Sequence, residues 1–234
     1  DLFCDGQAGM NGVAVDPDFA KNGYVYVYST SSKSSPQTNR VIRLKANADL
    51  SKLSDRTDIV DDIPYKIAAS DHPFGSSGAH NGGRIRFNSG DGFLYVTTGD
   101  THNGVVPQSP TKLGGKVLRI DRNGKAAAGN KPPKGFDARI FTYGHRNPQG
   151  IAFRPGTNQP VTADVEEEVG YKITIIGKGI DASEPEKPGF INEIENKVEK
   201  IGGLLNKVDQ GFADLQDAKN NLFASITSRK ERSK

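Results

Sequence analysis

Short runs of apolar or alternating residues, separated by turn residues, dominate the chain up to about residue 158. The runs that predict strands lie near residues 24–28, 40–44, 84–87, 93–98, 116–120 and 150–153. Asn22-Gly23 and Asp91-Gly92 lie between such runs, and these dipeptides are strong hairpin signals because glycine readily adopts the positive φ angles of tight turns. We therefore expect residues 9–158 to be almost entirely β-structure.

The strand pattern repeats along the chain. Glycine followed by alternating apolar residues occurs around Val13, returns around Ile85 and begins a third time around Ile151. Short strands that repeat at this spacing are typical of β-propeller blades. An ordinary β-sandwich with chance similarity is the alternative, and the three matching starts favour the propeller.

A different pattern begins at residue 191. Apolar residues recur at two positions of a seven-residue repeat, which favours a coiled coil or a long helix packed on a partner. The first position holds Ile191, Val198, Leu205, Phe212, Lys219 and Ile226, and the second holds Ile194, Ile201, Val208, Leu215 and Leu222. Gly202-Gly203 would also allow a helical hairpin, but the unbroken register favours one helix. Because an amphipathic helix must cover its apolar stripe, we expect self-association through residues 191–226, with the open edge of the β-structure as the alternative partner.

These patterns divide the chain into three segments. Residues 1–160 form the β-propeller portion, about two and a half blades, and residues 161–183 contain one strand, Tyr171–Ile176, within a connector. Residues 184–234 comprise a linker rich in proline and the long amphipathic helix. The predicted fold class is mainly β, a partial propeller followed by a C-terminal helix or coiled coil.

Composition narrows the classes of function. The 234 residues include 27 glycines, 13 prolines and no tryptophan, which is typical of a loop-rich protein. No apolar run approaches the roughly 20 residues of a membrane-spanning helix, so we expect no membrane span. The net charge of +3 is not concentrated in a basic stripe, so we expect no nucleic-acid partner. The first residues show no signal-peptide pattern, and the single cysteine, Cys4, excludes an internal disulfide.

The clearest candidate for chemistry is His80, which lies on the glycine-rich turn Gly78–Gly83. Glycines allow a flat ligand to approach the backbone, and histidine exchanges a proton near neutral pH. On composition alone His80 is one loop histidine among four. The four histidines lack the paired spacing of a zinc site, so no residue is assigned to a metal.

Several motifs occur in the order of one known family. They are Asp5-Gly6-Gln7-Ala8-Gly9-Met10-Asn11-Gly12, Ala79-His80-Asn81-Gly82-Gly83-Arg84, Tyr95–Asp100, Gly114–Asp121 and Tyr143-Gly144-His145-Arg146-Asn147-Pro148-Gln149-Gly150-Ile151-Ala152-Phe153. Over about residues 5–158 the chain resembles the soluble aldose (glucose/sorbosone-type) dehydrogenases, which use pyrroloquinoline quinone (PQQ) in a six-bladed propeller. The second and last motifs together carry the resemblance.

The resemblance implies roles for particular residues. His80 aligns with the base that removes the proton of the sugar's anomeric hydroxyl as hydride passes to PQQ. Arg146 aligns with a residue that contacts the cofactor and stabilises charge on its oxygen, and Asn147 with a second cofactor contact. Gln7 aligns with a residue that holds the sugar. Asp100 is expected to stabilise a turn beside the histidine.

The resemblance also implies calcium as a second cofactor, an external electron acceptor and a periplasmic or secreted location. After Asn158, however, the sequence lacks the Gly-Pro turn whose carbonyls bind calcium in the family, and the later blades are absent. Two hypotheses follow. The first is a PQQ-dependent sugar dehydrogenase that oxidises an aldose to its lactone. The alternative is a non-catalytic truncated propeller that acts as a binding or assembly module through its C-terminal helix.

Overall fold

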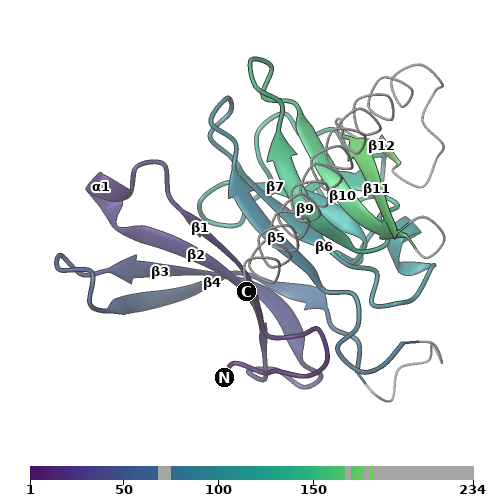
Figure 1. Ribbon diagram of the computed structural model, residues 1–234, viewed down its shortest axis with the longest axis horizontal. Coiled ribbons are helices and arrows are strands. Elements are labelled where there is room, and N and C mark those ends of the chain that lie inside the picture. The colour runs from purple at the N-terminus through teal and green to yellow at the C-terminus, as the bar shows by residue number, and fades with distance from the viewer. Residues whose placement is uncertain (68–74, 167–169, 177–179, 182–234) are drawn as a thin grey trace, which may run out of the picture. The chain divides into compact units, whose positions relative to one another are not determined.

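The computed structural model describes residues 1–67, 75–166, 170–176 and 180–181, and these residues are mainly β-structure (Figure 1). The first sheet, sheet A, has the order β1-β2-β3-β4 with antiparallel neighbours. Its strands are β1 (Met10–Val15), β2 (Tyr24–Ser31), β3 (Thr38–Ala46) and β4 (Leu53–Pro64). The described helices are both short: α1 (Phe19–Asn22) and the 3₁₀ turn η1 (Val106–Gln108).

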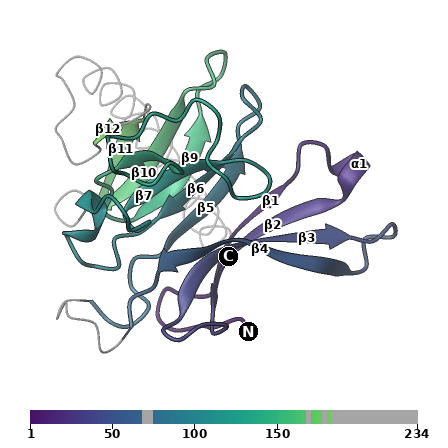
Figure 2. The ribbon, with the colours of Figure 1, turned by 180° about the vertical axis from the view of Figure 1, so that it is seen from behind.

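Two further sheets follow along the chain. Sheet B has the order β12-β8-β7-β6-β5, with β12 parallel to β8, and sheet C has the order β11-β10-β9 (Figure 2). The strands of sheet B are β5 (Gly82–Phe87), β6 (Leu94–Thr98), β7 (Lys116–Ile120), β8 (Ile140–Tyr143) and β12 (Ile180–Asp181). Those of sheet C are β9 (Pro148–Phe153), β10 (Pro160–Glu166) and β11 (Gly170–Ile175).

The structure confirms the strands expected from the sequence pattern. The three repeat positions Val13, Ile85 and Ile151 lie in β1, β5 and β9, each the first strand of its sheet. The sequence pattern did not predict β4, β8, β10 or β12. Strand β4 is rich in aspartate and has an exposed first half, and aspartate is depleted in strands, so its pattern is that of a loop. The expected strand at 171–176 is present as β11, which pairs with β10.

Two apolar cores hold the sheets together. The first lies between sheets A and B and includes Tyr26, Tyr28, Val41, Ile85 and Leu118. The second lies between sheets B and C and consists of Tyr95, Val117, Phe141 and Ile176, with Phe93, Ile151 and Phe153 packed against it. Sheet B therefore buries both of its faces. This packing brings the loops that precede β5, follow β6 and precede β9 close together.

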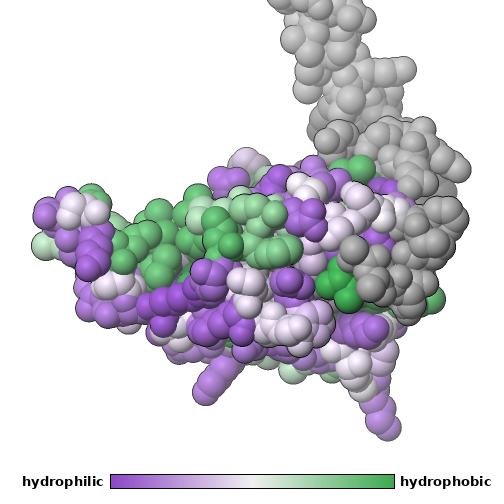
Figure 3. All heavy atoms as spheres, turned by 90° about the horizontal axis from the view of Figure 1, so that it is seen from below, coloured by the Kyte–Doolittle hydropathy of each residue, from purple (hydrophilic) through white to green (hydrophobic). Residues whose placement is uncertain are grey.

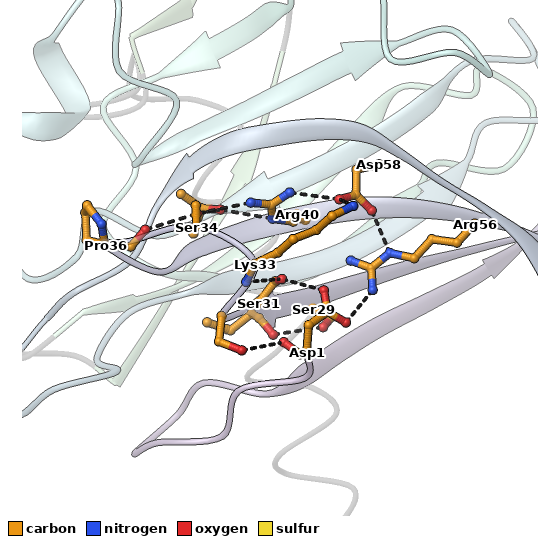
Figure 4. A network of polar contacts seen from close by, with 12 residues as sticks. Asp1, Ser29, Ser31, Lys33, Ser34, Pro36, Arg40, Arg56 and Asp58 are labelled. Atoms are coloured by element: carbon orange, nitrogen blue, oxygen red, sulfur yellow. Dashed lines mark hydrogen bonds and ion pairs between the residues drawn. The ribbon is translucent and has the colours of Figure 1, made fainter.

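The other face of sheet A is open over part of its area. Met10, Val13 and Val15 of β1 are 65%, 63% and 56% exposed, and apolar side chains form a band in Figure 3. On the same sheet, Asp58 accepts hydrogen bonds from Arg40 (2.8 Å) and Lys33 (3.1 Å) (Figure 4).

Arg56 donates to Asp58 from the opposite side (2.7 Å) and also pairs with Asp1. Burial by itself would raise the pKa of Asp58, but hydrogen bonds from Arg56, Lys33 and Arg40 bring it down to about 2. The ionised form of Asp58 is therefore part of how sheet A is held together.

The predicted C-terminal helix and its self-association through residues 191–226 lie outside the described residues, and so does the predicted linker at 184–189. Residues 185–234 form a unit separate from residues 1–184. Within the described ranges no helix has the length and apolar character needed to cross a bilayer.

Candidate active site

His80 lies in the loop between β4 and β5. Its backbone is left-handed, with a φ of 51°, a conformation that few residues other than glycine adopt. The backbone N–H of His80 donates to Gln7 Oε1 (3.1 Å), and the hydroxyl of Tyr28 donates to the carbonyl of Asn81 (2.8 Å). A Cβ atom on Gly99 would overlap the carbonyl of His80, so glycine there lets the end of β6 approach the turn. The chain around His80 is thus held from both sides.

The imidazole of His80 is paired with Asp100, which follows β6. His80 Nδ1 lies 2.7 Å from Asp100 Oδ1, and both residues are only 6% exposed. Because an ionised carboxylate only accepts hydrogen bonds, the neutral ring carries its proton on Nδ1 and keeps a lone pair on Nε2. Within the described part of the chain Nε2 accepts no hydrogen bond. The geometry therefore leaves Nε2 for a hydroxyl of a bound molecule.

The loop between β8 and β9 brings Arg146 and Asn147 to the same place. The backbone N–H of Asp100 donates to the carbonyl of Arg146 (2.8 Å), and the Arg146 side chain donates to the carbonyl of Val165 (3.2 Å). Asn147 is 1% exposed, and its Oδ1 accepts the backbone N–H of Gly82 (3.0 Å). Asn147 thus links the arginine loop to the histidine turn.

Asp164 of β10 holds this loop through hydrogen bonds to its backbone. Its Oδ1 accepts the backbone N–H of Asn147 (2.6 Å), while Oδ2 accepts the backbone N–H of Arg146 (3.2 Å) and lies 3.1 Å from His145 Nδ1. On its other side His145 Nε2 lies 2.7 Å from Thr142 Oγ1, so both ring nitrogens have partners. Asp164 and His145 are buried and organise the loop.

A second histidine, His102, lies beside the first. Its ring is stacked on that of His80, with 4.5 Å between the ring centroids and 27° between the planes. Burial, and then the positive charge of His80, lower the pKa of His102 below its ordinary value. The sequence analysis did not assign His102 to the site, because a position two residues after Asp100 carries no signal that its side chain folds back.

The four residues predicted from the motifs are brought together, although up to 140 residues separate Gln7 from Asn147. Gln7 and Asn147 contact the histidine turn directly, and Arg146 is joined to it through Asp100. Their roles toward sugar and cofactor stay predictions. Asp100 lies beside the histidine as expected, whereas the contributions of His102 and Asp164 were missed.

The described side chains of the site offer a positive charge for an anionic cofactor such as PQQ, but no cluster of side chains that would bind a calcium ion beside it. PQQ is an anionic quinone, and the partly buried guanidinium of Arg146 offers a permanent positive charge and donors that match carboxylate or quinone oxygens. Calcium prefers several carboxylate and carbonyl oxygens. Among the described residues no group of three or more His, Cys, Asp or Glu side chains is placed to bind a metal ion.

The stacked β-sheets thus place a buried His–Asp pair beside a loop that carries an arginine. Comparison with known proteins gives the family. The profile described as Glucose / Sorbosone dehydrogenase matches residues 1–181, beyond Asn158 where the recognised motifs end. The chain belongs to this family of sugar dehydrogenases.

Individual relatives agree with this assignment. The aldose sugar dehydrogenase YliI of Escherichia coli K12 is 30% identical over 88% of this chain and 53% of its own length. Quinoprotein glucose dehydrogenase B of Acinetobacter calcoaceticus is 27% identical over 97% of this chain and 49% of its own. The PQQ-bound aldose sugar dehydrogenase of Streptomyces coelicolor has a TM-score of 0.66 and 29% identity, covering 80% of this chain and 51% of that one. The chain spans about half the length of these relatives.

Proposed function

We propose that this chain carries part of the active site of a PQQ-dependent dehydrogenase that oxidises an aldose at its anomeric carbon to the lactone. The observation that carries the proposal is the His80–Asp100 pair, with 2.7 Å between Nδ1 and Oδ1 and with Nε2 left without a partner among the described residues. Membership of the family and the PQQ-bound structure of a relative support the choice of cofactor.

In the proposed reaction His80 acts as the general base. Its Nε2 accepts the proton of the anomeric hydroxyl, and Asp100 holds the ring in the required tautomer and stabilises the imidazolium that forms. When bound, PQQ supplies the chemistry that accepts the hydride, and an external acceptor then takes the electrons. Arg146 stabilises negative charge on a quinone oxygen because it keeps its own positive charge throughout.

Gln7 is proposed to orient the sugar. Its side-chain oxygen accepts the N–H of His80, so its amide N–H₂ group extends from a point fixed relative to the base. Gln7 is exposed, and within the described residues its N–H₂ group makes no hydrogen bond. We propose that it donates to a sugar hydroxyl. Asn147, in contrast, already uses its side-chain oxygen within the protein, so only its amide N–H₂ group is left for a cofactor contact.

The three sheets are proposed to be successive blades of a propeller of the family type. Their packing through two apolar cores, with β1, β5 and β9 at equivalent repeat positions, supports this proposal. The bound calcium of the family is proposed only by resemblance, because among the described residues no group of three or more His, Cys, Asp or Glu side chains is placed to bind a metal ion. A periplasmic or secreted location also stays a prediction.

Titration with PQQ, with and without added calcium, tests the proposed function. We expect saturable changes in the quinone absorbance, and dye reduction that depends on added aldose. Arg146→Lys keeps a positive charge but loses the planar donor pair, and is expected to weaken binding. If PQQ saturates Arg146→Ala at the same concentration as wild type, PQQ binds at a place other than the one proposed. Failure of the wild-type chain to bind PQQ would favour the alternative, a non-catalytic assembly module.

A further inference from the structure

His102 and His80 are organised by one carboxylate oxygen. Asp100 Oδ1 lies 2.7 Å from His80 Nδ1 and also accepts the backbone N–H of His102 at 2.6 Å. The same aspartate therefore fixes the ring of one histidine and the backbone of the other. This shared contact keeps the two residues side by side, and their rings lie one above the other.

The backbone that carries His102 is strained. Thr101 and His102 both have left-handed φ angles, 58° and 57°, and for a β-branched residue such as Thr101 this is an outlier. Backbone strain persists only where surrounding contacts impose it, and it concentrates at functional sites. Two consecutive strained residues next to the candidate base indicate that the stacked placement of His102 is imposed by its contacts.

The position of the His102 ring is also limited on its other side. A Cβ atom on Gly75 would lie 2.7 Å from Cδ2 of His102, so the backbone of Gly75 lies close against that ring. His80 covers another part of the same ring. His102 is thus held between the histidine turn and Gly75, and has little freedom to leave the stack.

We propose that His102 is a positioning residue for His80: its ring covers one face of the His80 imidazole and keeps that ring turned with Nδ1 on Asp100 and Nε2 toward the substrate. The use of this arrangement in proton removal rests on the proposed function. The positioning itself is a property of the protein without any ligand, and is testable without activity.

The charges around His102 agree with this role. His80 is stacked on His102, and Asp100 and Arg146 are the other charged residues among those described that act on its pKa. Burial and the positive charges of His80 and Arg146 lower its pKa, while its backbone hydrogen bond and the charge of Asp100 act in the opposite direction. A neutral His102 can remain against His80 when His80 takes up a proton, whereas two protonated rings would repel each other.

The test compares His102→Phe, which keeps an aromatic ring, with His102→Ala, which removes it. The first readout is the NMR spectrum of the His80 ring protons in the ligand-free full chain, assigned with His80→Asn. A stacked ring shifts these protons through its ring current. This shift reports the stack itself, and it vanishes with the ring whatever His80 does. The orientation of His80 is therefore read from the nitrogen chemical shifts of its ring: we expect Nδ1 to stay protonated in the phenylalanine variant, as in wild type, and the two tautomers to mix in the alanine variant. Val105→Ala, at an exposed position of the same loop, is the control and should change nothing.

The second readout is turnover by PQQ-loaded protein. Misplacing a catalytic group by about 1 Å costs about 100-fold, so we expect kcat to fall about 10- to 100-fold in His102→Ala with KM nearly unchanged, and to recover in His102→Phe. An alanine variant in which His80 keeps its proton on Nδ1 as fully as in wild type would overturn the proposal. So would a phenylalanine variant that keeps the ring-current shift but is as slow as alanine, since His102 would then act through its nitrogens. Absence of all PQQ turnover would count against the proposed function, while the NMR readout would still decide the positioning.

Discussion

Two compact polar groups in this protein are built differently. The Asp58 cluster on sheet A joins Asp58 to Lys33, Arg40 and Arg56. The His80 cluster, in the loops before β5 and after β6, joins His80 to Asp100 and His102. Asp58 has three cationic partners and lies on strand β4, and its charge is fully used within the protein (Figure 4). His80 lies on left-handed backbone and keeps one ring nitrogen without a partner among the described residues. A closed set of ion pairs stabilises a sheet, whereas strain together with an unused atom is typical of a functional site.

The largest expected effect comes from replacing His80 with asparagine. Asparagine tolerates left-handed backbone, and its amide can still donate to Asp100, so only the free nitrogen is lost. We expect sugar oxidation by PQQ-loaded protein to fall at least about 100-fold, since general bases contribute about 10²- to 10⁴-fold. Asp58→Asn in the same assay should keep its turnover. Near-normal turnover of His80→Asn would remove His80 as the base.

Asp164→Asn is expected to damage both the fold and the site. Asp164 accepts two backbone N–H groups on different oxygens, and an asparagine would turn its own N–H₂ group toward one of them. A buried donor without an acceptor costs about 1–3 kcal/mol, so we expect a loss of about 2 kcal/mol in the free energy of unfolding.

Tyrosine fluorescence reports the unfolding of the β-structure and not of the C-terminal residues, because all seven tyrosines lie before residue 172. Faster amide exchange at Gly82 and Asp100, which donate to the same loop, should accompany the loss of stability. The exposed turn residue Asp49 serves as the matched control, and Asp49→Asn should leave the free energy of unfolding nearly unchanged. Equal effects of the two variants would contradict the supporting role of Asp164.

Asp58→Asn is expected to be destabilising without affecting PQQ affinity. It leaves Arg40, whose side chain is 7% exposed, without its carboxylate, at a cost on the order of 1–2 kcal/mol. The pKa of Asp58 is about 2 in the folded protein against an ordinary 3.8, so its contribution is present above about pH 4 and is lost as the pH falls toward 2.

The difference in unfolding free energy between wild type and Asp58→Asn should therefore shrink over that interval. Asp62→Asn, a more exposed carboxylate on the same strand, should show a smaller difference at every pH. A difference that stays constant down to pH 2 would show that the charge of Asp58 is not the cause.

Lys33→Met is expected to have the smallest effect. Lys33 lies 3.1 Å from Asp58, but its side chain is 57% exposed, and exposed ion pairs contribute about 0.2–1 kcal/mol. Asp58 also keeps both arginines. We expect a change under about 0.5 kcal/mol in denaturant unfolding, and a still smaller one at high salt. A loss as large as that of Asp58→Asn would show that the lysine, and not the arginines, holds the cluster.

The sequence by itself determined the local structure and part of the site. The alternation of apolar residues identified most strands, because each strand must place every second side chain in a core, and the motifs identified His80 and Arg146. The sequence pattern missed β4, whose exposed aspartates resemble a loop, and β8, whose burial comes from the sheets on either side. It also missed β10 and β12, which lie in or at the edge of the segment expected to hold a single strand.

Only the tertiary structure decided which residues meet. Asp100 reaches His80 because β5 and β6 pair, Asp164 supports Arg146 because β10 pairs with β9, and His102 stacks on His80 because a strained turn folds back. None of these contacts leaves a periodic signal, since each joins segments whose spacing along the chain depends on loop length. The sequence therefore names the candidate residues for the chemistry, while the packing of the sheets selects those that hold them in place.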